Sequence, residues 1–482
     1  MTNSQTNTTY HRGLDLENQA RFKEAKAVYS DLLPHVTDPS LLEKLGFRMA
    51  DMDDLIQEKN LYQRIDQEAK QVLTDIGIDL THSPDLMDLL MAADAVDLEN
   101  ETALFIPLRK DYIDHCLSLV PRQMTADPGL NTFGTGSTSP FLKRSTDDRL
   151  CPASRQEYEK IIAEVGDARD VTGIFSLPVA FDKSVSFVEI AQMMEKGYPG
   201  FKMIPTNTMD DDALAFLKGK PDWLDGTSLI ASLAPMDNMV APFLRSARAG
   251  NNLLLIDQTI AGVSGPATPQ ALLTQVHAQV LFMMIVAQTL TPGTVCVHCG
   301  IPSVTNAGGQ LSYSSPHQTF INAALARLNT WVTGFASSQT GGSTSLDQVN
   351  DQAIKDSELS RNALRKYGVH ILRHAMGALG SLTFFSLEKF LLDCERERQA
   401  VDVFNALPKD KGVIPLYVPE DANALDGIRE IAEKGNPRHA DHSLRHVDAF
   451  RLWETTIHGA AKEKSYYPSL NDVVMDAVKN PA

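Results

Sequence analysis

A Cys-Val-His-Cys run is the first group of residues whose types and spacing could do chemistry. Cys296, His298 and Cys299 offer two thiolates and an imidazole, a set that suits zinc, and zinc could activate a thiol for methylation. On a strand, Cys296 and His298 would face one side and Val297 the other, and no second pair of soft ligands lies nearby. The sequence therefore favours small buried cysteines over a zinc site.

A second group of imidazoles lies near the carboxyl end of the chain. On a helix, His442 and His446 would share one face at i, i+4, which is a workable metal spacing. A solvated or salt-bridged cap is the interpretation that the sequence favours. Hydrolase motifs give no better lead, because no H-E-x-x-H occurs and Gly262-Val263-Ser264-Gly265 lacks the second glycine of a nucleophile elbow in register.

Aromatic residues at predicted loops and strand ends could bind a quaternary ammonium ion. Aromatic faces attract such cations, with a contribution of up to about 2 kcal/mol when the pair is desolvated. Ordinary packing at the rim of the fold is the alternative for each of these residues. The candidates are Phe133, Phe181, Tyr313, Phe335 and Phe384.

These residues must be positioned by a set of alternating strands and helices. Short apolar runs alternate with helical stretches after Pro152, and one helix is well marked by Thr268 as N-cap and Pro269 as first residue. Repeated strand–helix units specify a parallel sheet, and seven or eight of them favour an α/β fold of the (β/α)8 TIM barrel type. The predicted strands are 171–179, 201–205, 228–234, 253–260, 294–298, 331–337 and 369–374.

In a barrel of this kind, chemistry takes place on the loops that follow the carboxyl ends of the strands. Each residue at such an end could instead be a helix cap or a turn former, so several of them on one face are a stronger signal than any one. The residues at the predicted strand ends are Phe181, Thr206, Asp237, Gln258, His298, Ser343 and His374.

The part of the chain before the barrel is predicted to be mainly helical. We expect a peripheral extension over 1–40, a mainly helical region over 41–150, and the barrel with a C-terminal cap over 151–482. In the second region, the apolar runs 78–80 and 103–107 could pair as strands, and Phe133 lies in a glycine-rich connection that could contact a ligand.

Charge and cysteine content limit the class of protein. Lys and Arg number 44 against 61 Asp and Glu, and a formal charge of −17 argues against a nucleic-acid or anionic-membrane partner. Five scattered cysteines do not form a disulfide framework, and the polar N-terminus has no secretory signal. Four polar residues interrupt the most apolar helix, 272–290, which favours a buried helix over a membrane span. We expect a cytoplasmic protein.

Several segments, in order over residues 41–460, resemble the trimethylamine methyltransferase family of corrinoid-dependent enzymes. Gly341-Gly342-Ser343-Thr344 is similar to the loop in which the founding members carry pyrrolysine between Gly-Gly and Thr, and here Ser343 takes that place. Gln352 matches a glutamine of the following helix, whereas Asn350 and Asp356 depart from the family's Asp and Glu. The other matching segments are 72–78, 133–136, 260–268, 292–295, 374–377, 387–389 and 441–444.

The resemblance implies a TIM barrel that docks a corrinoid-binding protein over its mouth. Members with pyrrolysine demethylate trimethylamine, and members without it include glycine betaine methyltransferases. A serine cannot reproduce the electrophilic imine chemistry attributed to pyrrolysine, so Ser343 disfavours trimethylamine. We therefore expect transfer of a methyl group from a quaternary amine to the Co(I) corrinoid (cobalamin) of a partner protein. The enzyme would hold no cofactor tightly itself, and we expect a homo-oligomer.

Methyl transfer from a quaternary ammonium requires no general acid or base from the protein. Its leaving group is a neutral tertiary amine, so the methyl group needs no prior activation and the protein has to position the cation and exclude water. Two alternatives stay open: another methyl donor, such as a sulfonium or methoxy compound, and a non-catalytic betaine-binding or sensor protein. Around the ammonium we expect Phe133, Phe181, Gln258, Tyr313, Phe335 and Phe384, with His298, Ser343 and His374 as polar contacts to the substrate carboxylate or the corrinoid edge.

Overall fold

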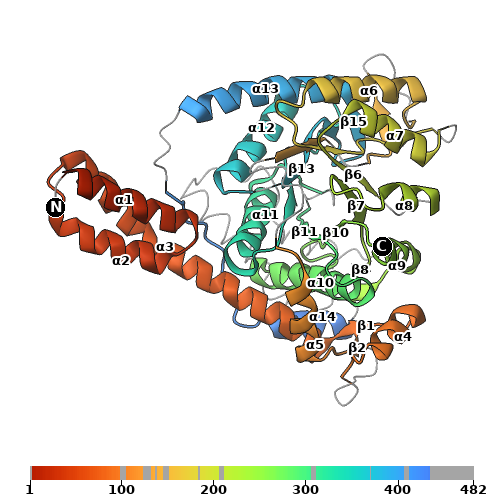
Figure 1. The fold of residues 1–482 in the computed structure, drawn as a ribbon, viewed down its shortest axis with the longest axis horizontal. Helices are drawn as coiled ribbons and strands as arrows, with labels where there is room; N and C mark the ends of the chain where they lie inside the picture. Colours follow the sequence, from red (N-terminus) through yellow and green to blue (C-terminus); the bar gives the residue numbers. More distant parts are fainter. Residues whose placement is uncertain are drawn as a thin grey trace, which may run out of the picture.

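Eight parallel strands form a barrel at the centre of the molecule (Figure 1). The structure, a computed structural model, describes residues 3–97, 105–122, 132–135, 138–144, 151–182, 185–205, 211–305, 311–369, 371–406 and 412–434. The sheet order is β11-β10-β7-β6-β5-β3-β13-β12. It closes where the His298 N–H donates to the Ala336 carbonyl at 2.8 Å, just before β12. The predicted TIM barrel is thus confirmed. The strands are β3 (Thr132–Thr135), β5 (Ile174–Ser176), β6 (Phe201–Pro205), β7 (Trp223–Thr227), β10 (Leu253–Asp257), β11 (Cys296–Gly300), β12 (Ser338–Thr340) and β13 (Ile371–Met376).

Three strands differ in position from the sequence prediction. Segment 228–234 is a small hairpin of β8 (Ile230–Ala231) and β9 (Ala234–Pro235), and the barrel strand β7 precedes it. Segment 331–337 precedes β12, because a π-helical turn, η4 (Asn329–Thr333), runs on from helix α11 and ends at Gly334. The barrel takes its first strand, β3, from the region before residue 151, where Gly and Thr replace the apolar run of a typical buried strand.

Helices follow the barrel strands and surround the sheet (Figure 1). Several begin with caps that the sequence encodes: Ser154 and Ser186 each form a capping box with a glutamate three residues on. The helices are α6 (Arg155–Asp167), α7 (Phe187–Gly197), α8 (Asp211–Leu217), α9 (Asp237–Ala249), α10 (Pro269–Leu290), α11 (Pro316–Leu328), α12 (Asp351–Lys366) and α13 (Leu387–Ala406).

Helix α10 begins at Pro269 after Thr268, as predicted, but the Thr268 hydroxyl donates to Asp421 Oδ2 at 2.6 Å and does not cap the helix. It is the one helix among the described residues that is long and apolar enough to cross a membrane. Its most apolar window is fully buried against the rest of the fold, so α10 is a core helix.

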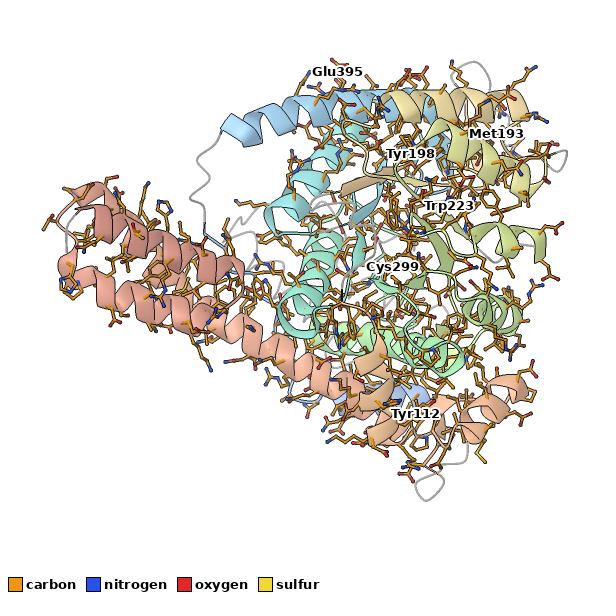
Figure 2. The ribbon with its side chains drawn as sticks, in the orientation of Figure 1. Tyr112, Met193, Tyr198, Trp223, Cys299 and Glu395 are labelled. Atoms are coloured by element: carbon orange, nitrogen blue, oxygen red, sulfur yellow. The ribbon has the colours of Figure 1, made fainter. Side chains whose placement is uncertain are left out.

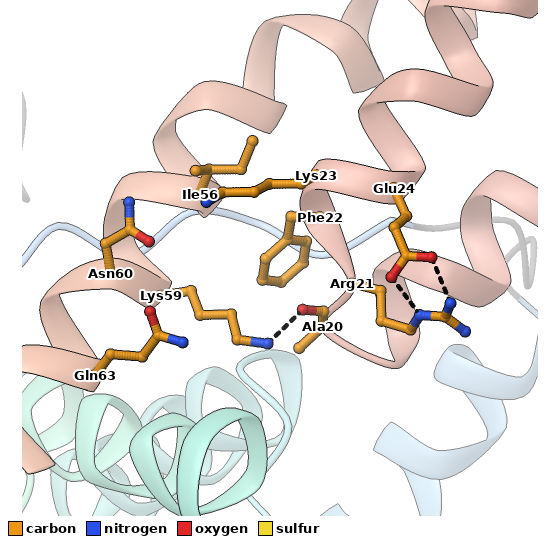
Figure 3. A pocket seen from close by; sticks show the side chains of 9 residues that line it. All are labelled: Ala20, Arg21, Phe22, Lys23, Glu24, Ile56, Lys59, Asn60 and Gln63. Atoms are coloured by element: carbon orange, nitrogen blue, oxygen red, sulfur yellow. Dashed lines mark hydrogen bonds and ion pairs between the residues drawn. The ribbon is translucent and has the colours of Figure 1, made fainter.

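The N-terminal helices form an arm that projects from the barrel (Figure 1). The arm has its own apolar core, and α3 runs from it to the side of the barrel over 33 residues, about 50 Å at 1.5 Å per residue. Figure 3 shows a groove on the arm, where the Lys59 ammonium donates to the Ala20 carbonyl at 2.8 Å beside Phe22. The helices are α1 (Asn3–Asn18), α2 (Phe22–Leu32) and α3 (Pro39–Gln71), with a short 3-10 turn, η1 (Leu33–His35), between the last two.

A small subdomain follows α3 and packs beside α10. The predicted pairing of two apolar runs is confirmed, since Ile78 of β1 pairs antiparallel with Ile106 of β2. Helix α14, which follows the barrel in sequence, also contacts α10. The elements are η2 (Val72–Ile76), β1 (Ile78–Asp79), α4 (Pro84–Ala92), β2 (Phe105–Ile106), α5 (Lys110–Leu119) and α14 (Ala424–Lys434).

The barrel interior changes character along its axis. Ile174, Phe201, Leu224, Leu254 and Val297 fill the interior with apolar side chains. Towards the carboxyl ends of the strands, several inward positions hold small or polar residues, although β10 has Ile256 there. This end therefore has the groups that could hold a polar ligand. The inward residues there include Ser176, Gly226, Cys299, Thr340 and Arg373.

Candidate functional site

Five polar residues meet at the carboxyl end of the barrel. Arg373 Nη2 donates to His374 Nε2 at 2.9 Å, and Thr340 Oγ1 lies 2.6 Å from His374 Nδ1. The Tyr313 ring packs edge-on against the His374 ring, with centroids 6.0 Å apart. Gln258 Nε2 donates to the Tyr313 hydroxyl at 2.6 Å. We call these residues (Gln258, Tyr313, Thr340, Arg373 and His374) the mouth cluster.

Local backbone irregularity brings two adjacent residues of β13 into the mouth cluster. Arg373 pairs with Thr340 of β12 in regular register, but His374 has a left-handed φ of 58° and the pairing with β3 shifts between Leu372 and Met376. In a regular strand, neighbouring side chains point to opposite faces. The bulge turns His374 so that its ring contacts the Arg373 guanidinium. Non-glycine residues in this conformation concentrate at functional sites.

The ionisable side chains around Arg373 are held neutral. Burial is the main cause that lowers the pKa of His374 well below its ordinary value, with the Arg373 charge adding to it. Since Arg373 donates to Nε2, the His374 proton lies on Nδ1 and is donated to Thr340. Burial raises the pKa of Tyr313 to about 12 and also raises the pKa of the Cys299 thiol, which accepts from Arg373 Nη1 at 3.2 Å. Figure 2 shows Cys299 inside the barrel.

The Gly-Gly-Ser-Thr loop lies directly beside the mouth cluster. Gly342 has a φ of 82°, and a Cβ there would lie 2.6 Å from the Ala375 carbonyl oxygen, next to His374. Ser343 is fully buried, and its hydroxyl has no hydrogen-bond partner in the described chain. Thr344 donates to Asp356 Oδ2 at 3.1 Å and fixes the loop to α12. Ser343 therefore presents an unsatisfied hydroxyl in the loop that was expected to be functional.

His298, by contrast, faces away from the barrel interior. Its Nε2 lies 2.9 Å from His277 Nδ1 on α10, and His277 Nε2 lies 3.1 Å from Asp66 Oδ1 on α3. The Gly300 N–H donates to His298 Nδ1 at 3.3 Å, so the His298 proton lies on Nε2 and points to His277. Asp66, His277 and His298 form a hydrogen-bonded chain that connects the arm to the barrel. His298 therefore points away from the mouth and is not placed to contact a ligand there.

We expect His298 to make the free energy of unfolding decrease as the pH is lowered. Burial, reinforced by His277, lowers its folded pKa well below 6.5, so below pH 6.5 the unfolded chain binds a proton that the folded chain does not. This contribution is complete above pH 6.5 and declines as the pH falls, by about 1.4 kcal/mol per pH unit. Urea unfolding at pH 7.5, 6.5 and 5.5 measures it.

The His298→Gln variant is the matched comparison. Its free energy of unfolding should depend less steeply on pH, by the equivalent of one bound proton, about 1.4 kcal/mol per pH unit. Asp257 acts in the opposite direction, since burial raises its pKa to about 7, but both proteins have this residue. Equal slopes for the two proteins would show that His298 is protonated in the folded state.

The structure does not bring the predicted aromatic residues together. Phe181 packs edge-on against Tyr158 and Phe187, with ring centroids 6.1 and 5.6 Å away, between α6 and α7. Phe335 precedes β12, at the opposite end of the barrel from the mouth, and lies under Arg122 at 4.0 Å. The strand that holds Phe133 is described, but its side chain lies outside the described residues. Of the four whose side chains are described, Tyr313 is the one in the mouth cluster.

Phe384 lies on a small sheet that extends past the end of β13. Strands β14 (Ala378–Leu379), β15 (Phe384–Ser386) and β4 (Phe141–Lys143) form it. The Phe384 ring contacts Phe141, with centroids 6.3 Å apart, and the Lys143 ammonium lies 5.6 Å from it. The aromatic face is thus already next to a cation of the chain itself.

No group of three or more His, Cys, Asp or Glu in the described part of the chain could hold a metal ion. Cys296 faces α10, where Gln288 Nε2 lies 3.7 Å from its sulfur, whereas Cys299 faces the barrel interior. The alternation of the strand separates the two thiols. His442, His446 and Thr206 lie outside the described residues, and Asp237 is exposed at the start of α9.

Sequence reasoning missed Arg373 and Thr340. The signal for Arg373 was an arginine in the strand Ile371–Met376, which is apolar apart from this residue and the predicted His374. A buried cation in such a run needs a specific partner, and this requirement could have identified it. Thr340 gave no comparable signal, because threonine is a common strand residue.

Sequence comparison relates the chain to known methyltransferases. The model of the family described as trimethylamine methyltransferase (MTTB) matches residues 227–465. Glycine betaine methyltransferase of Desulfitobacterium hafniense (strain Y51) is 23% identical over 404 residues, which cover 78% of this chain and 80% of that protein.

Two crystal structures of the methyltransferase MtmB are also similar to the chain. The hydroxylamine complex of MtmB has a TM-score of 0.45 at 11% identity, and the monomethylamine methyltransferase MtmB of Methanosarcina barkeri has a TM-score of 0.43 at 11% identity. Each comparison covers 89% of this chain and 93% of the other. Residues 227–465, which hold the entire mouth cluster, are a domain of the trimethylamine methyltransferase family, and the chain is a methyltransferase.

Proposed function

We propose that this methyltransferase moves a methyl group from a quaternary amine, such as glycine betaine or a related betaine, to a Co(I) corrinoid carried by a partner protein. The corrinoid supplies the nucleophile that attacks the methyl carbon. The chain's own residues bind the amine, orient one N–CH3 bond and exclude water from it. A relative that is a glycine betaine methyltransferase supports this substrate class.

The observation that carries the proposal is the absence of charge on the acid–base groups of the mouth cluster. His374 has a pKa well below its ordinary value, and the pKa of Tyr313 is raised to about 12. Neither side chain is thus tuned for proton transfer near neutral pH. Methyl transfer from a quaternary ammonium fits this arrangement, because the departing tertiary amine is neutral and needs no proton.

Two further features support a bound molecule at this end of the barrel. Ser343 Oγ and Arg373 Nε are buried and lack partners within the described chain, which suits a site that a ligand completes. Tyr313 offers an aromatic ring for the ammonium group, next to the His374 ring. Both features are at the carboxyl ends of the strands, where TIM-barrel enzymes bind their substrates.

The proposal also covers location and assembly. All five cysteines are free thiols, which supports a reducing cytoplasm as the compartment. The homo-oligomeric state expected from the family resemblance stays a prediction.

The test is methyl transfer in solution with a corrinoid-binding protein reduced to Co(I). With glycine betaine, the Co(I) absorption should be replaced by that of the methylated Co(III) corrinoid, and one dimethylglycine should form for each methyl group transferred. Trimethylamine should not react. A panel that adds carnitine, a sulfonium and a methoxy compound separates the other methyl donors. Reaction with no quaternary amine in the panel would contradict the proposal, and tight betaine binding without transfer would indicate a binding protein.

A further inference from the structure

We infer that Arg373 binds a carboxylate of the substrate, and that the chain therefore selects zwitterionic quaternary amines over simple cationic ones. The inference rests on the proposed function and names its substrate class more closely. Arg373 thereby has a role in substrate specificity within the mouth cluster.

The electrostatic surroundings of Arg373 differ from those of every other buried cation in the described chain. Five lysine or arginine side chains are buried there, and four of them have a carboxylate oxygen within 3.0 Å. Arg373 makes no ion pair with a described residue. The four paired cations are Lys202 with Asp222, Arg327 with Glu58, and Arg361 and Lys389 with Asp393.

The contacts that Arg373 does make leave its charge uncompensated. Nη1 donates to the Cys299 thiol and Nη2 donates to neutral His374, while Nε has no partner among the described residues. A guanidinium cannot lose its proton at neutral pH, so it stays charged when buried. A buried charge is costly unless it is paired. An anion that enters with the substrate would complete the site.

The geometry of a guanidinium suits a carboxylate better than other anions of similar size. Its parallel N–H groups can donate to both oxygens of one carboxylate. His374 is positioned to support this pairing, because its neutral ring accepts from Arg373 and its own proton goes to Thr340. Arg373 is thereby held in place while it keeps its positive charge.

Charge balance then explains the choice of substrate. A purely cationic amine, such as choline or tetramethylammonium, would bring a second positive charge beside Arg373 in a site of low dielectric. A betaine brings equal and opposite charges, so its carboxylate can pair with Arg373 while its ammonium lies towards the Tyr313 ring. Rejection of bare cations and binding of betaines thus have one cause.

Calorimetric titration of the whole chain with glycine betaine and with choline tests the inference without any methyl transfer. The wild-type protein should bind glycine betaine at least on the order of 100-fold more tightly than choline. The Arg373→Gln variant should lose this preference through weaker binding of glycine betaine, on the order of 100-fold. The Arg373→Lys variant keeps the charge but loses the two-point contact, so its affinity should lie in between.

Lys202→Met is the matched control, because it removes a buried cation that has its own carboxylate partner outside the mouth cluster. It should lower the melting temperature and leave both affinities unchanged. Circular dichroism shows whether each variant is folded. If Arg373→Gln does not fold, the binding test relies on Arg373→Lys.

Equal binding of choline and glycine betaine by the wild-type protein would overturn the inference, as would unchanged betaine binding by Arg373→Gln. Failure to bind any carboxylate-bearing amine would overturn it as well. If the wild-type protein demethylates choline as readily as glycine betaine, the proposed methyl transfer holds and the role of Arg373 is wrong. If betaine binding depends on Arg373 but no methyl group is transferred, the role of Arg373 holds and the proposed reaction is wrong.

Discussion

Replacement of Asp393 by alanine is expected to destabilise the protein by about 3–5 kcal/mol, because it leaves buried Lys389 without its counter-ion and leaves Arg361 with only the more distant Glu397, at 3.6 Å. Asp393 is fully buried on α13 and pairs with Arg361 at 3.0 Å and Lys389 at 2.6 Å. It also accepts the Gly377 N–H at 2.9 Å, just beyond β13. Urea unfolding at pH 7.5 measures the loss.

The same substitution should also reduce methyl transfer in the folded protein. Arg361, which Asp393 holds, donates to the Ala375 carbonyl at 2.8 Å, so the pair fixes the backbone directly after His374. A shift of that backbone would move His374 relative to Arg373. The rate of methyl transfer, measured without urea and well below the melting temperature of the variant, separates this effect from unfolding.

Asp170→Ala is the matched control for Asp393. Asp170 pairs with Arg398 at 2.6 Å, but both side chains are about half exposed, at 52% and 45%. An exposed pair of this kind contributes about 0–1 kcal/mol. Equal losses for the two variants would show that the buried network does not stabilise the fold more than a surface pair does.

Much of the fold could be predicted from local patterns in the sequence. Alternating apolar runs and helical stretches indicated the barrel, and Thr268-Pro269 marked the start of α10. The strand bounds were less accurate where packing outside the sheet imitates a strand. Trp331 is apolar because it packs against Phe22 and Tyr62 of the arm, with ring centroids 4.9 and 5.8 Å away, and not because it lies in β12.

The site was harder to predict because both faces of a barrel strand are buried. In an amphipathic strand the polar residues show which face is outside, but in Cys296–Gly300 every residue is buried. The sequence therefore could not show that His298 faces α10 while Cys299 faces inward. A chemical requirement, such as the missing counter-ion of Arg373, appears only when the contacts are known.

The aromatic residues illustrate the same limit. Phe181 and Phe335 lie near predicted strand ends, yet Phe181 packs against Tyr158 and Phe187, and Phe335 lies under Arg122. Tyr313 and Gln258 were predicted individually and do meet, at 2.6 Å. Their pairing depends on the loop after β11 folding back over β10, which local propensity does not encode.

Replacement of Gly342 by alanine is expected to destabilise the protein by about 2–5 kcal/mol, from two separate causes. Its φ of 82° disfavours any residue with a Cβ, and a Cβ there would lie 2.6 Å from the Ala375 carbonyl oxygen and 2.8 Å from Ala375 Cα. Backbone atoms cannot move aside as a flexible side chain can. The loop before Ser343 and the strand that holds His374 would have to separate.

Gly368→Ala isolates the first cause. Gly368 has nearly the same φ, 79°, at the exposed end of α12, and a Cβ there would meet nothing within 4 Å. That variant should lose only about 1 kcal/mol, the cost of a left-handed alanine. The difference between the two unfolding free energies then measures how closely the Gly-Gly loop must approach β13. Because Arg373 and His374 lie on that strand, Gly342→Ala should also weaken betaine binding while Gly368→Ala leaves it unchanged. Equal stability and binding in both variants would mean that the close approach of the two segments is not needed for the mouth cluster.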